Sequence, residues 1–246
     1  MLEELFPWVA LVTVTAIAAA VHAALGFGSG PLMVPVLLAV VEPAVAVVAA
    51  ILVGIAVNVL QLIAERRRPQ VAVRKLVPLW LAAVPGGVAG ALAAGALSST
   101  ALAVVVAAVL MLSAMTLFLH PAPSIRLPAA AMAGAGVVAG ATAALTGIFG
   151  PLLGVVLVAA GERGAALRVG LGASFLVVGT TTIVISLFLT GAWSGFPVAG
   201  ALLLPAVVGY LIGRRGAGRL APGAQRRAVL VAVLTGAGFA LVRAAT

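Results

Sequence analysis

The stretches LGFGSGP (residues 25–31) and LTGIFGP (residues 145–151) decide the fold of this chain. Each follows a long apolar run and opens a short one. Glycine adopts backbone conformations closed to other residues, and proline is preset for the first turn of a helix. Each stretch therefore predicts that one helix ends and a short helix begins within a few residues.

The composition around these stretches requires a lipid environment. Of the 246 residues, 64% are hydrophobic and 8% are charged, whereas soluble domains carry roughly 25% charged residues. Even a globule of about 300 residues buries only about 75% of the surface that its unfolded chain exposes. The composition thus predicts an all-α polytopic membrane protein.

Ten apolar segments follow from the sequence, of which eight have the roughly 17–25 residues needed to cross a bilayer. The long segments are Phe6–Ala24, Pro43–Ala64, Leu76–Leu97, Ala101–Leu119, Leu127–Leu145, Ala165–Thr190, Phe196–Ile212 and Ala228–Val242. The short ones, Pro31–Val41 and Pro151–Ala160, begin at the two glycine–proline stretches and suggest broken helices.

The two halves of the chain repeat one another at an offset of 120 residues. Matching pairs are Leu25 and Leu145, Gly30 and Gly150, Pro31 and Pro151, Glu42 and Glu162, and Pro85 and Pro205. The alternative is coincidence in a chain rich in alanine, glycine and valine. The offset predicts a first transmembrane repeat over residues 1–120 and a second over residues 121–246.

The basic loops indicate that the two repeats have opposite orientations. The first loop carries Arg66, Arg67, Arg68, Arg74 and Lys75, and the second carries Arg214, Arg215, Arg219, Arg226 and Arg227. They fall at different connections of the two halves, which is typical of an inverted-topology repeat. If both loops are cytoplasmic, every basic residue except Arg243 lies inside and both termini lie outside.

The two stretches also predict a binding site. Free N–H groups and the positive dipole end make a helix N-terminus attractive to anions. Unpaired backbone at membrane depth persists only where it lines protein or a wet cavity. Two such breaks related by an inverted repeat predict one anion site between them. The alternative is that both are ordinary tight turns at the membrane surface.

These glycine–proline patterns resemble the TauE/SafE sulfite exporter family over nearly the whole chain. The resemblance rests on Gly26-x-Gly28-x-Gly30-Pro31 with Pro35, on Gly140 with Thr146-Gly147-x-x-Gly150-Pro151, and on Pro205-x-x-x-Gly209-x-x-x-Gly213 followed by Arg219-Leu220. The chain departs from the family's triple-glycine form at Ser29 and Phe149, which bears on the substrate more than on the fold. The resemblance implies transport of sulfite, sulfonates or other small organic anions across a bacterial inner (plasma) membrane.

Polar residues within the spans extend this candidate site. Asn58, Gln61 and Thr181 could offer hydrogen bonds to an oxyanion, although small polar residues also join helices without further function. The candidate substrate-binding residues are Gly26, Gly28, Ser29, Gly30, Pro31, Asn58, Gln61, Thr146, Gly147, Gly150, Pro151, Arg168 and Thr181.

Two ionisable residues, His22 and Arg168, allow a functional and a structural interpretation, and a third, Glu65, has a simple one. His22 lies one turn before the first stretch and could take a coupling proton, or it is a hydrogen-bonded packing residue. Arg168 is either an anion clamp or an interfacial anchor on the inner side. Glu65, beside Arg66, is most simply a solvated loop charge.

The composition argues against several classes of function. The chain has no cysteine and two histidines, so thiol chemistry is excluded and metal chemistry has few ligands. Its basic residues lie between apolar segments, which argues against a nucleic-acid partner. Ser29 has only His22 nearby, seven positions earlier in the same segment, so we expect no enzyme.

The sequence therefore predicts a secondary transporter that needs no cofactor and works by alternating access between its repeats. Its partners are a small anion and the bilayer. A homodimer is possible through the small-residue surfaces around Gly86, Gly87, Gly90, Gly134, Gly136 and Gly140. The alternatives are a carrier of another small organic anion or a passive anion channel.

Overall fold

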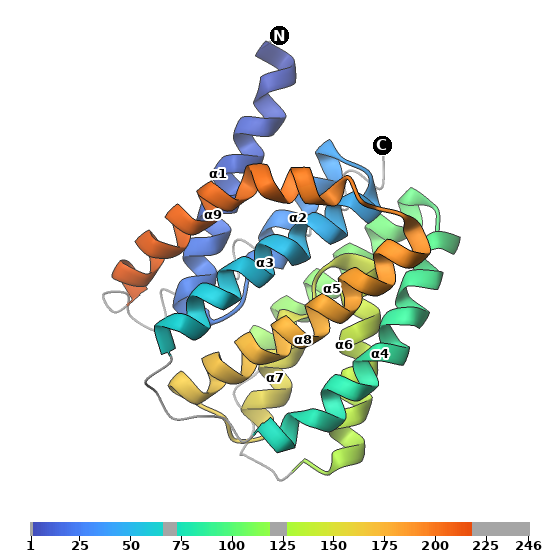
Figure 1. Cartoon of the computed structure of the whole chain (residues 1–246), viewed down its shortest axis with the longest axis vertical. Coiled ribbons are helices and arrows are strands. Elements are labelled where there is room, and N and C mark those ends of the chain that lie inside the picture. Colours follow the sequence, from blue (N-terminus) through green and yellow to red (C-terminus); the bar gives the residue numbers. More distant parts are fainter. Residues whose placement is uncertain (1, 66–72, 119–126, 218–246) are drawn as a thin grey trace.

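The computed structural model describes residues 2–65, 73–118 and 127–217, which form nine α-helices and no strand (Figure 1). The helices are α1 (Leu2–Leu25), α2 (Ser29–Val40), α3 (Pro43–Glu65), α4 (Val73–Ala96), α5 (Ser99–Phe118), α6 (Ala129–Thr146), α7 (Gly150–Ala159), α8 (Gly164–Thr190) and α9 (Gly195–Ala217). The predicted all-α architecture is confirmed. The predicted segment Ala228–Val242 lies outside the described residues.

The protein is a multi-pass membrane protein. Within the described ranges, α1, α3, α4, α6, α8 and α9 are long and apolar enough to cross a bilayer. Their outward faces carry large apolar side chains, such as Phe188 with 86% of its surface exposed and Leu204 with 73%. A soluble bundle would bury such residues, whereas lipid accommodates them.

Glycines bring α4 and α6 into backbone contact. A side chain on Gly86 or Gly90 would overlap the backbone of Val137 or Ala141. The residue numbers rise together along both helices, so α4 and α6 are parallel. Gly136 and Gly140 are likewise held against Leu79 and Ala83. These four glycines pack within one chain, so they are not available for the possible homodimer, whereas Gly134 has open space beside it.

A second seam of this kind joins α1 and α9, which also run in parallel. Gly209 and Gly213 of α9 lie against the backbone of Ala16 and Ala20 (Figure 1). At the offset of 120 residues, Ala16 and Ala20 correspond to Gly136 and Gly140 of α6. At this offset α1 corresponds to α6 and α4 corresponds to α9, so each pair joins one helix from each predicted repeat, while the inverted repeat itself stays a prediction.

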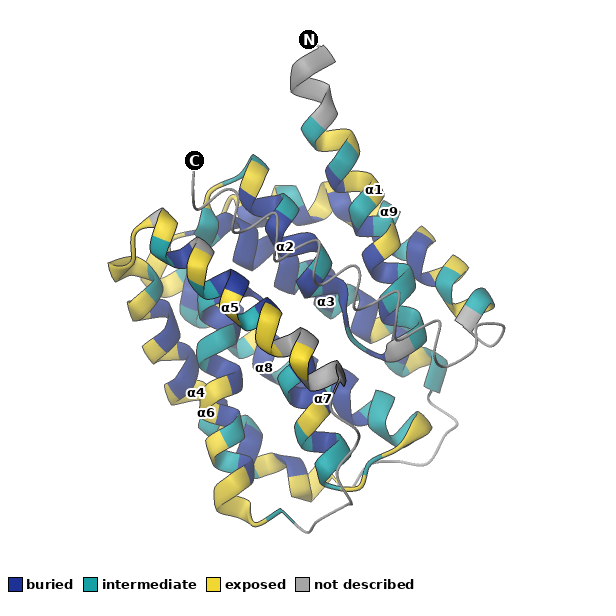
Figure 2. Cartoon of the chain, turned by 180° about the vertical axis from the view of Figure 1, so that it is seen from behind, coloured by how far each residue is buried: buried dark blue, intermediate teal, exposed yellow. Residues whose placement is uncertain are grey.

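The centre of the bundle holds α2 and α3, which are largely buried (Figure 2). Helix α3 runs antiparallel to α8, because Gly172 lies near Leu62 whereas Gly179 lies near Ile51. One buried cluster gathers around α1, α2, α3 and α9, and another around α4, α6, α7 and α8. Both short helices thus begin inside the protein.

Candidate functional site

The two glycine–proline stretches lie against each other inside the bundle. A Cβ atom on Gly30 would lie 2.9 Å from the carbonyl oxygen of Gly147. A Cβ atom on Gly150 would lie 3.2 Å from the Cβ of Phe27. The breaks between α1 and α2 and between α6 and α7 therefore share one place in the fold.

Each break turns on a glycine in a left-handed conformation. Gly28 precedes α2 with φ of 122°, and Gly147 ends α6 with φ of 68°. Residues with a Cβ rarely adopt such angles, so glycine is required at both turns. Neither α2 nor α7 receives a side-chain hydrogen bond at its N-cap. No side chain therefore caps the first-turn amides of either helix, and Pro31 and Pro151 have no N–H.

A buried polar network adjoins the first break. The His22 Nδ1 atom lies 3.0 Å from the Ser29 Oγ atom, and its Nε2 lies 3.3 Å from the Asn58 Oδ1. Asn58 in turn donates from Nδ2 to the carbonyl oxygen of Gly54 over 2.7 Å. All three side chains are buried. His22 and Ser29, seven positions apart in the sequence, are therefore in direct hydrogen-bond contact.

The network fixes where its protons lie. The amide nitrogen of Asn58 must face the Gly54 carbonyl oxygen, which leaves Oδ1 as an acceptor for His22. His22 must therefore carry its hydrogen on Nε2, and in the neutral ring Nδ1 is an acceptor. The Ser29 hydroxyl then donates to His22.

A second set of polar side chains, from α3 and α8, packs beside the same break. Gln61 donates from Nε2 to the carbonyl oxygen of Arg168 over 3.1 Å, and Arg168 Nε is 2.8 Å from Glu65 Oε1. A Cβ on Gly26 would lie 3.0 Å from Arg168 Cγ, so this arginine packs on the first stretch. Glu65 is the last residue of α3, and 13% of its side chain is exposed. The prediction of a solvated loop charge was wrong.

The side of the site formed by the second break is aromatic. The ring centroids of Phe149 and Phe175 are 4.5 Å apart, and Phe175 also lies 5.8 Å from His22. Phe27 packs over Gly150 and Gly154. The only hydroxyl in the second stretch, on Thr146, is occupied locally, because it donates to the Thr142 carbonyl and accepts the Ile148 amide.

The remaining candidates are less directly placed. Pro31 and Pro151 are buried in the first turns of α2 and α7. Thr181 is half-buried on α8. Neither the ion pair of Glu65 nor the three phenylalanines of the site were predicted from the sequence. A signal for Glu65 existed, since it lies four residues after Gln61 and so shares its helix face, whereas the phenylalanines read as ordinary apolar residues.

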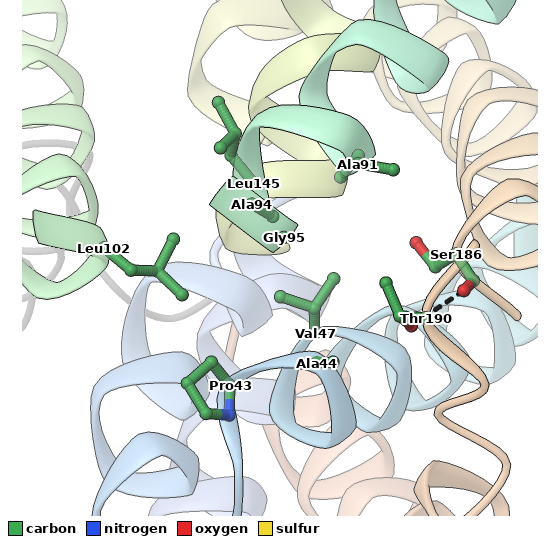
Figure 3. Close-up of a pocket in the computed structure, with 11 residues that line it drawn as sticks. Pro43, Ala44, Val47, Ala91, Ala94, Gly95, Leu102, Leu145, Ser186 and Thr190 are labelled. Atoms are coloured by element: carbon green, nitrogen blue, oxygen red, sulfur yellow. Dashed lines mark hydrogen bonds between the residues drawn. The ribbon is translucent and has the colours of Figure 1, made fainter. Parts of the chain in front are cut away.

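Two cavities lie at opposite ends of α4 and α6. One, of about 160 Å³, lies at their C-terminal ends and reaches Leu145, next to the second break (Figure 3). Its wall is mostly apolar, and the Thr190 hydroxyl on it donates to the Ser186 carbonyl. The other, of about 460 Å³, lies at their N-terminal ends and is lined by Arg74, Lys75 and Glu162.

This geometry favours anion binding over metal chemistry. The described residues contain no cluster of three histidine, cysteine or acidic side chains that could hold a metal ion. They do contain two uncapped helix N-termini, a serine hydroxyl and a buried histidine at one place. Such donors suit a small anion with several oxygen atoms.

Comparison with known proteins gives one clear relationship. A family model described as "Sulfite exporter TauE/SafE" matches residues 11–241, nearly the whole chain. Searches of curated proteins and of solved structures give no match.

Proposed function

The chain belongs to the TauE/SafE sulfite exporter family, and we propose that it exports small sulfur-containing oxyanions such as sulfite or organosulfonates. Family membership and the six long apolar helices make it a multi-pass membrane transporter. A bacterial inner membrane, with both termini outside, is the location we propose from the basic loops and the family.

One observation carries the proposal: two helix N-termini without side-chain caps begin beside each other in the protein interior. An oxyanion between them would accept amide hydrogen bonds from α2 and α7 and meet the positive ends of both helix dipoles. Such interactions are strong where water is scarce.

The candidate residues take different roles in this proposal. Gly28, Gly30, Gly147 and Gly150 let the backbone approach the anion, and Ser29 supplies a hydroxyl. Asn58 acts through His22, to which it is hydrogen-bonded. Gly26 accommodates the stem of Arg168. The other candidates shape the site around them.

Alternating access would connect the site to each side of the membrane in turn. The cavities at opposite ends of α4 and α6 support this mechanism, since one reaches Leu145 beside the second break and the other lies at the far end of α7. Arg74 and Lys75 line the cavity on the predicted cytoplasmic side, where positive charge raises the local concentration of anions. An anion would thus be collected from the side that it leaves.

The experiment that tests the proposal measures flux in proteoliposomes loaded with sulfite or with methanesulfonate. A carrier gives saturable efflux, and it gives counterflow when unlabelled anion is placed on the opposite side. Flux that rises linearly with concentration and shows no exchange would instead support a passive anion channel. Transport of carboxylates alone would identify a carrier of other organic anions.

A further inference from the structure

The hydrogen-bond chain from Asn58 through His22 to Ser29 does more than pack the first break. It ends at the first residue of α2, where the proposed anion would bind. Asn58 fixes the hydrogen on His22 Nε2, so a second proton can bind only at Nδ1. That atom is the one that now accepts the Ser29 hydroxyl over 3.0 Å.

From this geometry we propose that His22 and Ser29 form a proton-operated switch that couples anion binding to the uptake of one proton. The inference rests on the proposed function, because it concerns the same anion site. When a proton from solvent binds to His22 Nδ1, the hydrogen bond reverses and Nδ1 donates to Ser29 Oγ. The Ser29 hydrogen is then free to turn toward the anion, and no other bond forms or breaks.

The proton and the anion favour each other for two reasons. In the neutral state the Ser29 hydroxyl presents lone pairs to the N-terminus of α2, which repel an oxyanion. In the protonated state it presents a hydrogen instead. In addition, an imidazolium buried among apolar side chains is unfavourable unless a negative charge lies nearby. The anion supplies that charge, so each ligand raises the affinity for the other.

Among the ionisable groups on the helices around His22, we expect the imidazole to be the one that gains the proton. Helix α2 has no ionisable residue, and α3 contributes Glu65, which is paired with Arg168 of α8 over 2.8 Å. Helix α9 packs on α1 and carries Tyr210, Arg214 and Arg215. Phe175 of α8 covers one side of the imidazole. Glu65 and Arg168 offset each other's charge, and the arginines keep theirs throughout the range of interest.

Binding of methanesulfonate to the purified full-length protein tests the switch. A sulfonate stays fully ionised from about pH 5 to pH 9, so any pH dependence belongs to the protein. Isothermal titration calorimetry in two buffers with different ionisation enthalpies counts the protons taken up. We expect about one proton per anion, and an affinity that falls by up to about tenfold for each unit rise in pH.

The variants separate the switch from a general effect on stability. In His22→Asn we expect binding without proton uptake and without pH dependence. Ser29→Ala should bind the anion several-fold more weakly at low pH and lose most of the pH dependence, whereas Ser29→Thr keeps the hydroxyl and should retain it. Thr15→Ala is the matched control. It also removes a buried hydroxyl, but this hydroxyl lies on α1 and donates to the Leu11 carbonyl of the same helix. It should behave like the wild type.

The outcomes distinguish the switch from the function on which it rests. Suppose that His22→Asn or Ser29→Ala binds the anion and takes up as many protons as the wild type. Either result would overturn the switch and leave the anion site intact. Binding of the anion with no proton uptake in the wild type would do the same. No binding at any pH by a folded protein would overturn the proposed function and the switch together.

Discussion

The two breaks occupy equivalent places in the sequence but differ in chemistry. At the offset of 120 residues, Ser29 corresponds to Phe149, and Asn58 corresponds to Val178. The first break is held by buried hydrogen bonds and an ion pair, and the second by aromatic packing and the local bonds of Thr146. The glycine–proline pair that opens each short helix recurs at this offset, but the left-handed glycines do not. Gly28 aligns with Ile148, and Gly147 aligns with Phe27.

This difference suggests that the two breaks contribute different groups to anion binding. Backbone amides can come from both breaks, because both keep glycine and proline at the start of a short helix. Switchable donors come only from the first break within the described residues. The aromatic wall of the second break suits the apolar part of an organosulfonate. A symmetric inorganic anion has no apolar part, so it would use the hydrogen-bond donors and not the aromatic wall.

The largest expected effect concerns the contact between the breaks. Gly30→Ala places a Cβ 2.9 Å from the Gly147 carbonyl oxygen, and backbone has little freedom to move. Overpacking of this kind costs about 1–3 kcal/mol, and we expect transport to fall by at least about tenfold. Gly150→Ala meets the end of the Phe175 ring at 2.7 Å, which can turn aside, so a loss of only a few-fold is expected. Flux in proteoliposomes measures both.

Gly134→Ala provides the control for this pair. It lies in α6 with no atom within 4 Å of an added Cβ, so transport and thermal stability should stay at or slightly above those of the wild type. If Gly30→Ala transports normally, the breaks do not need close contact and the shared anion site loses its support.

A smaller effect is expected at the ion pair that holds the first break. Arg168→Gln removes the guanidinium from the partly buried Glu65 carboxylate, at a cost of about 1–2 kcal/mol after allowance for the 29% exposure of the arginine side chain. The double variant with Glu65→Gln removes both charges and should recover most of the lost stability and anion binding. Thermal unfolding and calorimetry follow the two quantities.

The double variant also decides what Arg168 does. If Arg168 binds the anion directly, binding stays as weak in the double variant as in Arg168→Gln, even when stability returns. Recovery of binding instead identifies a residue that positions the first break through its stem on Gly26. Such a cycle isolates the pair because both partners are removed in turn.

Much of the fold was predictable because a bilayer constrains a chain strongly. Apolar length alone located seven of the described helices within about five residues at each end, and the glycine–proline stretches located the starts of α2 and α7. The start of α4 was missed by three residues because Arg74 and Lys75 ended the apolar run although the helix includes them. Hydropathy indicates the part of a helix that contacts lipid. A helix that continues beyond the lipid, as α4 does, therefore starts earlier than its apolar run.

The side-chain contacts of the site were less predictable. A separation of seven residues places His22 and Ser29 about two turns apart on a continuous helix. The break at Gly26 and Gly28 turns the chain back, which brings the serine to the imidazole. The ion pair of Glu65 with Arg168 depends on how α3 crosses α8. Such contacts follow from tertiary packing that the spacing of residues does not contain.

The smallest expected effect tests whether the polar break is a binding element or a reactive centre. Ser29, His22 and Asn58 lie in the order of a nucleophile, a base and an orienting group. Yet Ser29 is 2% exposed and His22 is fully buried, so the hydroxyl is closed to solvent in this conformation. Asn58 is neutral and is bonded to Gly54, and it would not stabilise the imidazolium as a carboxylate does.

We therefore expect a fluorophosphonate probe to leave Ser29 unmodified when the intact protein is analysed by mass spectrometry, while a serine hydrolase added to the same sample is labelled. Labelling of the wild type that disappears in Ser29→Ala and in His22→Asn would show an activated nucleophile. The contrast between the breaks would then be one of a reactive and an inert half, because a hydroxyl that attacks phosphorus must be deprotonated by His22 rather than serve as a donor to a bound anion.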